Sequence, residues 1–177
     1  MQEQSGSGLQ ARPLTSGWFA LPQLPALGTL SAAGGDSVVL EASSPDGRAG
    51  FLVRRRSGGE SEYSLEVVVR SARDAAQPLL STVTYRQPDG HERVLLVPVA
   101  WGQFGPAAAY VGLRGFDTGT TWAATAPSPV SPDTNWDPTT VADSIDAALN
   151  EATRDAWRQV REFVNDQVRG VIDGALR

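Results

Sequence analysis

The chain has 177 residues, of which 41% are hydrophobic and 20% charged, values typical of a globular protein rather than a disordered one. Its net charge is −5 and its 15 basic residues are all arginine, a balance that argues against a nucleic-acid partner, which would require an excess of cations facing phosphate. Cysteine is absent, which excludes disulfides, thiolate nucleophiles and cysteine-ligated metals, and no motif predicts a cofactor.

Residues 1–13 are polar and are expected to form a flexible tail. This segment has neither the basic start nor the apolar stretch of a secretion signal. The longest apolar run, from Val94 to Trp101, is interrupted by Pro98 and is too short to cross a bilayer. We therefore expect a cytoplasmic protein that does not interact with membranes.

Residues 14–125 alternate short apolar runs with turn-forming clusters, which predicts a β domain. In residues 61–70, Tyr63, Leu65 and Val67 fall on one face of the expected strand, and polar side chains fall on the other. The other strands are expected at 18–21, 37–42, 50–56, 79–86, 92–100, 107–113 and 120–125.

The segment Gln87–His91 contains Pro88-Asp89-Gly90 and predicts a hairpin between two of these strands. The other connections are too short for crossover helices, so the strands should be antiparallel. Strands at this spacing predict a β-sandwich, with a small β-barrel as the alternative.

Residues 126–136 contain three prolines and are expected to form a semi-stiff linker. Residues 137–177 are then expected to form one long amphipathic helix. Asp137 would be its N-cap and Pro138 its first residue. Because neither Gly nor Pro occurs from Thr139 to Arg169, an unbroken helix over this stretch would be about 46 Å long.

Apolar residues recur along this helix at helical spacing. Because such a helix would be longer than the β domain, we expect its apolar stripe to remain partly uncovered and to bind a partner protein or a second copy of the chain. The expected partner-binding residues are Val141, Ile145, Leu149, Ala152, Ala156, Trp157, Val160, Phe163, Val164 and Val168.

Other residues are candidates for binding. Trp101, Phe104, Tyr110 and Trp122 are expected near strand ends, where aromatic side chains either close a core or stack on a sugar or small ligand. In Arg54-Arg55-Arg56, the first and third side chains would share one face of a strand. Arg54 and Arg56 would either protect a sheet edge or dock an anion.

Candidates for catalysis and metal binding are few. The single histidine, His91, falls on the expected hairpin turn. The sequence from Asp133 to Asp137 resembles the start of a calcium loop, but Pro138 stands at the position that requires Gly, so no metal site is expected. A pair of carboxylates suited to hydrolysis could come from the glutamates Glu41, Glu60, Glu62 and Glu66.

The sequence therefore favours a non-catalytic protein-interaction or assembly module that acts through its C-terminal helix. A carbohydrate- or small-ligand-binding β domain is the alternative, and a carboxylate-based hydrolase is a third candidate. An enzyme is not expected, because no catalytic motif is present.

Overall fold

A computed structural model of the chain describes residues 17–24, 37–56, 62–70, 77–101 and 107–177. The predicted tail at 1–13 and the candidate residues Glu60 and Phe104 lie outside the described residues.

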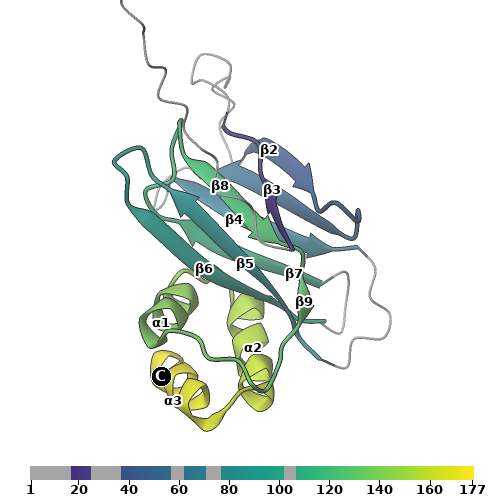
Figure 1. The fold of residues 1–177 in the computed structure, drawn as a ribbon, viewed down its shortest axis with the longest axis vertical. Helices are drawn as coiled ribbons and strands as arrows, with labels where there is room; N and C mark the ends of the chain where they lie inside the picture. Colours follow the sequence, from purple (N-terminus) through teal and green to yellow (C-terminus); the bar gives the residue numbers. More distant parts are fainter. Residues whose placement is uncertain (1–16, 25–36, 57–61, 71–76, 102–106) are drawn as a thin grey trace, which may run out of the picture.

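The described strands form two antiparallel sheets (Figure 1). One sheet has the order β1-β8-β5-β6, with β9 paired to β5, and the other has the order β2-β3-β4-β7. The strands of the first sheet are β1 (Trp18–Ala20), β8 (Thr121–Thr125), β5 (Leu79–Arg86), β6 (Glu92–Val99) and β9 (Ser128–Pro129). Those of the second are β2 (Ser37–Ser43), β3 (Ala49–Arg55), β4 (Tyr63–Val69) and β7 (Ala107–Leu113).

The prediction of a mainly β, antiparallel protein is thus confirmed. The alternative, a closed barrel, is not formed by the described strands, which divide between two separate sheets. The proline-rich segment predicted as a linker contributes β9, which pairs with Leu79 and Leu80 of β5.

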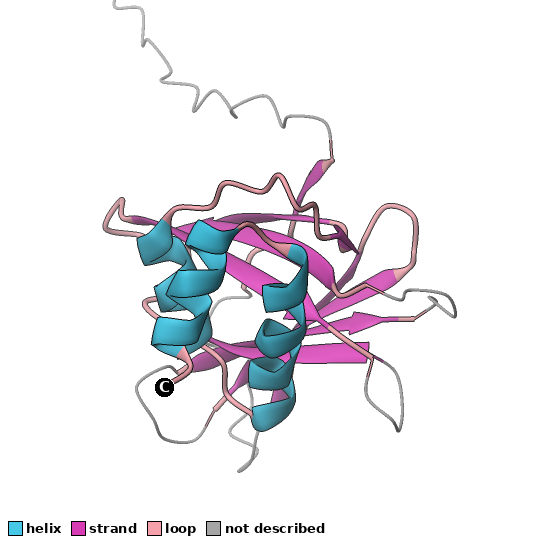
Figure 2. Cartoon of the chain, turned by 90° about the horizontal axis from the view of Figure 1, so that it is seen from below, coloured by secondary structure: helices cyan, strands magenta, loops and turns pink. Residues whose placement is uncertain are grey.

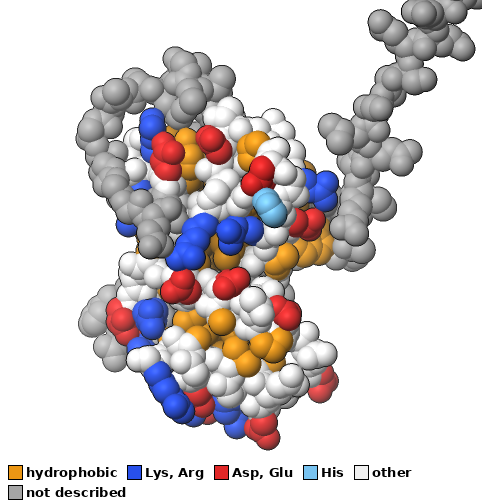
Figure 3. Space-filling model, turned by 90° about the vertical axis from the view of Figure 1, so that its left-hand side faces the viewer, with side chains coloured by type: hydrophobic (Ala, Val, Ile, Leu, Met, Phe, Trp, Pro, Cys, Tyr) orange, Lys and Arg blue, Asp and Glu red, His pale blue; other side chains and the backbone are white. Residues whose placement is uncertain are grey.

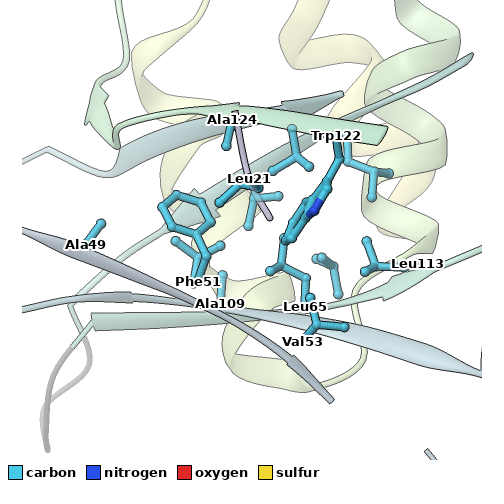
Figure 4. Packing of buried hydrophobic residues seen from close by; sticks show 14 of the residues in the cluster. Leu21, Ala49, Phe51, Val53, Leu65, Ala109, Leu113, Trp122 and Ala124 are labelled. Carbon is cyan, nitrogen blue, oxygen red and sulfur yellow. The ribbon is translucent and has the colours of Figure 1, made fainter. Parts of the chain in front are cut away.

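One hydrophobic core lies between the sheets (Figure 4). Leu65 and Val67 point into it from β4, as their alternation with polar residues predicts. Val83 enters it from β5 in the opposite sheet. Phe116, which follows β7, contacts the rings of Tyr63, Tyr85 and Trp122 edge-to-face at centroid distances of 6.0, 5.6 and 5.3 Å. These aromatic contacts close one end of the core.

The prediction of one continuous C-terminal helix is wrong. The segment folds instead into α1 (Pro138–Asp146), α2 (Glu151–Val160), a 3-10 turn η2 (Arg161–Phe163) and α3 (Asp166–Ala175). These elements, called the helical unit below, gather at the side of the sheets where β6 and β7 lie (Figures 1 and 2). The predicted start is confirmed, because the Asp137 carboxylate accepts a hydrogen bond of 2.9 Å from the Thr140 N–H.

The first break occurs where the chain pairs with the edge of β7. The Gly112 N–H donates to the Ala147 carbonyl at 2.8 Å, and the Leu149 N–H donates to the Tyr110 carbonyl at 3.0 Å. Asn150 then caps α2 by accepting from the Thr153 N–H at 2.9 Å. This stretch contains no Gly or Pro, so the end of α1 is set by competition from an unpaired strand edge.

The second break, before α3, also has an asparagine at the start of the new helix. Asn165 has extended backbone angles, and its side-chain oxygen accepts a hydrogen bond from the Val168 N–H at 3.0 Å. Its amide also donates to the Thr134 carbonyl at 2.7 Å. Asparagine is among the best N-cap residues, so Asn150 and Asn165 were sequence signals of new helix starts.

Because the helices fold back, the predicted apolar stripe forms a second hydrophobic core rather than an open surface. Leu96 and Val130 contribute to this core from outside the helical unit, and Leu80 packs against it. The stripe residues buried in the same chain are Val141, Ile145, Ala156, Trp157, Val160, Val164 and Val168. Leu149 and Phe163 are half-buried, and Ala152 is exposed.

Two hydroxyl groups hold the helical unit against the strand edges. The Ser144 Oγ accepts a hydrogen bond of 2.9 Å from the Leu96 N–H of β6 and donates one of 2.6 Å to the Thr140 carbonyl. The Thr153 Oγ1 accepts a bond of 2.8 Å from the Tyr110 N–H of β7. Both side chains are fully buried. The edges of β6 and β7 are therefore partly occupied by this chain itself.

Replacing Ser144 with alanine is expected to destabilise the protein by about 1–3 kcal/mol, because it leaves the buried Leu96 N–H without its partner. Urea unfolding followed by circular dichroism would measure the change in free energy. Thr139→Ala is the matched control, because Thr139 is exposed on the same helix. Equal stability of the two variants would contradict a structural role for this hydrogen bond.

A charged cleft between the β5–β6 hairpin and helix α1

An open cleft of about 590 Å³ lies where the β5–β6 hairpin, the end of β7 and helix α1 meet. Its size is within the range of small-molecule sites. Figure 3 shows arginine side chains gathered at this level, between the sheets above and the helices below, with acidic side chains beneath them. The cleft is thus lined by charges of both signs.

Tyr85 and Leu95 form the buried, largely apolar floor of the cleft. The Tyr85 hydroxyl donates a hydrogen bond of 2.7 Å to the Arg114 carbonyl. Burial raises the pKa of Tyr85 to about 12, although the positive charges of Arg93 and Arg114 act in the opposite direction. Tyr85 therefore stays neutral at physiological pH and serves to hold the end of β7 in place.

Two arginines line the side of the cleft formed by the sheets. Arg93 of β6 lies directly opposite Tyr85 of β5. Its side chain is on the same face of β6 as that of Leu95, which is two residues further along the strand and belongs to the core. Arg114, just after β7, forms an ion pair of 3.0 Å with Asp146 of α1. Within the described part of the chain Arg93 has no ion-pair or hydrogen-bond partner for its guanidinium.

Carboxylates line the rest of the cleft. Asp89 accepts a hydrogen bond of 3.0 Å from the His91 N–H in the hairpin turn. Glu92 forms an ion pair of 3.2 Å with Arg86. Asp143 lies on α1 at the opposite wall, and its carboxylate has no partner among the described residues.

One side chain of the cleft has the chemistry to bind an anion. A guanidinium presents a planar set of N–H donors that matches carboxylate and phosphate oxygens. Arg93 offers such a set at the mouth of a cleft with a buried aromatic floor. His91, the one histidine, lies at the rim with its side chain 81% exposed, as its predicted place in the turn implies. Arg93 is therefore the group of the cleft that matches a small anion.

The predicted aromatic platform is not assembled by the residues that the structure describes. Trp122 is buried in the core, and its Nε1 donates to the Pro22 carbonyl at 2.7 Å. Tyr110 lies on the outer face of β7, where its hydroxyl accepts from Ser64 at 3.3 Å. Trp101 is half-buried against the core between the sheets. These three side chains therefore do not share a surface.

The three consecutive arginines, residues 54–56, do not lie on an edge strand as predicted. β3 lies between β2 and β4, so the interpretation as a protected edge strand is wrong. Arg54 forms an ion pair of 3.0 Å with Glu66, which occupies its guanidinium. Arg56 follows the strand and pairs through its backbone N–H with the Glu62 carbonyl at 2.7 Å. Anion docking by Arg54 and Arg56 together stays a prediction.

The candidate glutamates are all paired where they are described. Glu66 binds Arg54, Glu62 binds Arg55 at 2.8 Å, and Glu41 lies 3.7 Å from Arg70. Across the described ranges no group of three His, Cys, Asp or Glu side chains is arranged to hold a metal ion.

The cleft residues were missed because their meeting depends on the fold. Arg93 lies in a predicted strand, Arg114 follows another, and Asp143 belongs to the predicted helix. None of them belongs to a sequence motif, and only the return of α1 to the β6 edge brings the three segments together.

Among the described helices, none has the length and apolar character needed to cross a bilayer. Comparisons of the chain with protein-family models, with curated proteins and with solved structures found no match.

Proposed function

We propose that this protein is a non-catalytic binding module, in which the two sheets form a β-sandwich and the cleft beside α1 binds a small anionic ligand. The proposal depends above all on Arg93, a guanidinium without a partner in the described structure, at the mouth of a cleft of about 590 Å³. It develops the small-ligand alternative from the sequence, with a different set of residues.

The pairing of the arginines points to Arg93 as the anion-binding group. Two arginines and three carboxylates line the cleft, and Arg114 is already paired with Asp146. Most other described arginines are paired with carboxylates on the surface, as Arg158 is with Glu151 at 2.7 Å. An anion on Arg93 would gain charge-assisted hydrogen bonds, and its apolar part could cover Leu95 and the ring of Tyr85.

Replacing Arg93 with glutamine is expected to weaken the binding of a small carboxylate about tenfold or more, the effect of losing a hydrogen bond to a charged group. The probe is caproate, titrated at low ionic strength and followed by amide chemical shifts in NMR spectra. In the unmodified protein, shifts should concentrate in β6, the end of β7 and α1.

The matched control is Arg158→Gln, which removes the same charge from the helical unit away from the cleft residues. Equal weakening by both substitutions would mean that only net charge matters. No binding of caproate, or shifts confined to other surfaces, would refute the proposed site.

A protein-interaction role through the C-terminal apolar stripe has less support. Most of that stripe is buried within the chain, so a partner could reach it only if the helical unit opened. We therefore rank binding of a small ligand above assembly through these residues.

A further inference from the structure

We infer that the ligand of the cleft is a zwitterion, with an anionic group held by Arg93 and a protonated amine held by Asp143. This inference rests on the proposed function and adds the second charge of the ligand. Its basis is the distribution of used and unused charges around one cleft.

Three carboxylates line the cleft, and two of them are engaged by the chain. Asp89 accepts the His91 N–H, and Glu92 binds Arg86. The third, Asp143, has no hydrogen bond or ion pair to its side chain among the described residues.

The other acidic side chains at α1 do have partners within the chain. Asp137 caps the start of the helix, and Asp146 forms an ion pair with Arg114. The acidic side chains on either side of Asp143 thus serve the fold, and Asp143 alone of the three does not.

The backbone holds Asp143 in a defined place. The next residue, Ser144, is fully buried and accepts the hydrogen bond from the Leu96 N–H. The Ala147 N–H donates to the Asp143 carbonyl at 3.0 Å. The carboxylate is therefore presented from a fixed helix on the wall that faces the hairpin, a position suited to a cation.

Arg93 and Asp143 line the same cleft but do not form an ion pair with each other within 4.0 Å. The lining of the cleft also includes the apolar residues Val94, Leu95 and Ala147. A ligand with an anion at one end, an ammonium at the other and a short aliphatic chain between them matches these three kinds of lining group.

The test uses the full-length protein and a set of ω-amino acids of increasing length: glycine, γ-aminobutyrate and ε-aminocaproate. Caproate lacks the amine and hexylamine lacks the carboxylate, so each isolates one charge. Binding is measured by NMR titration or calorimetry. We expect one of the longer amino acids to bind about tenfold more tightly than caproate, the gain from one more charge-assisted hydrogen bond.

Two variants assign the charges. Asp143→Asn should lower the affinity for the best amino acid to that for caproate, and should not weaken the binding of caproate itself. Arg93→Gln should weaken both. Asp133→Asn is the charge-matched control, because Asp133 is exposed and does not line the cleft.

The possible results separate the two proposals. If caproate binds through Arg93 but no amino acid binds more tightly, and Asp143→Asn changes nothing, the zwitterion is wrong and the anion site stands. If neither caproate nor any amino acid binds in the cleft, both proposals are wrong. Tighter binding that persists in Asp143→Asn would also overturn the role of Asp143.

Discussion

Replacing Trp157 with alanine is expected to lower the free energy of unfolding by about 3–5 kcal/mol, the usual cost of removing a large aromatic side chain from a core. Trp157 is fully buried in the second core. Its ring contacts that of Trp136 edge-to-face at a centroid distance of 6.3 Å. The cavity left by alanine would weaken the contacts that join α1, α2 and α3.

Trp157→Phe provides the matched control. The Trp157 Nε1 is buried and has no hydrogen-bond partner among the described residues, so replacing the indole with phenylalanine loses no hydrogen bond. We expect this smaller change in volume to cost less than the change to alanine, about 1–2 kcal/mol. Urea unfolding followed by far-ultraviolet circular dichroism would measure both variants. A loss below about 1 kcal/mol for the alanine variant would contradict a closed second core.

Removing residues 137–177 is expected to prevent the remaining chain from folding into a stable monomer. The deletion uncovers Leu96 and Val130, each of which gains about 1.5–3 kcal/mol from burial. It also removes the partners of the Leu96 and Tyr110 N–H groups on the strand edges. The summed loss of about 3–6 kcal/mol is comparable with the total stability of many domains.

Unpaired edges of β6 and β7 would also invite association between chains. The truncated protein should therefore aggregate or unfold broadly, as judged by sedimentation velocity and thermal unfolding. A monomeric fragment with a sharp transition would show that the sheets fold independently of the helical unit. That result would restore the view of the C-terminal segment as a separate arm.

The strands were predictable because their signals are local. β7 occupies the predicted residues, and the β5–β6 hairpin turns at Pro88-Asp89-Gly90, where Gly90 takes a φ of +93° that favours glycine. The start of α1 was equally predictable, because Asp137 is a typical N-cap residue and Pro138 is well suited to the first position of a helix. Each of these features depends on a few adjacent residues.

The long helix was predicted wrongly because helical periodicity does not record a competing partner. Ala147, Ala148 and Leu149 can all be helical, but they pair with the free edge of β7. That edge is formed by residues far away in the chain, so no local pattern reveals it. The caps Asn150 and Asn165 were present in the sequence, but their importance depends on where the helices can pack.

The cleft could not be predicted from local patterns either. Arg93, Arg114 and Asp143 come from three separate segments of the chain, and the sequence gives no reason to group them. Their grouping follows from the return of α1 to β6, which the buried Ser144 holds in place. A binding site made of single residues from several elements has no signature in any one of them.

The amino-acid sequence alone determined that this chain forms antiparallel sheets from short strands, ends in a helical segment and carries an apolar stripe along its last quarter. Only the tertiary structure decided that most of the stripe is buried inside the chain and that a charged cleft lies beside α1. The physical reason is that the periodicity of apolar residues indicates which face of a helix or strand is buried. The surface that covers this face is formed by strand edges and side chains that are distant in the sequence.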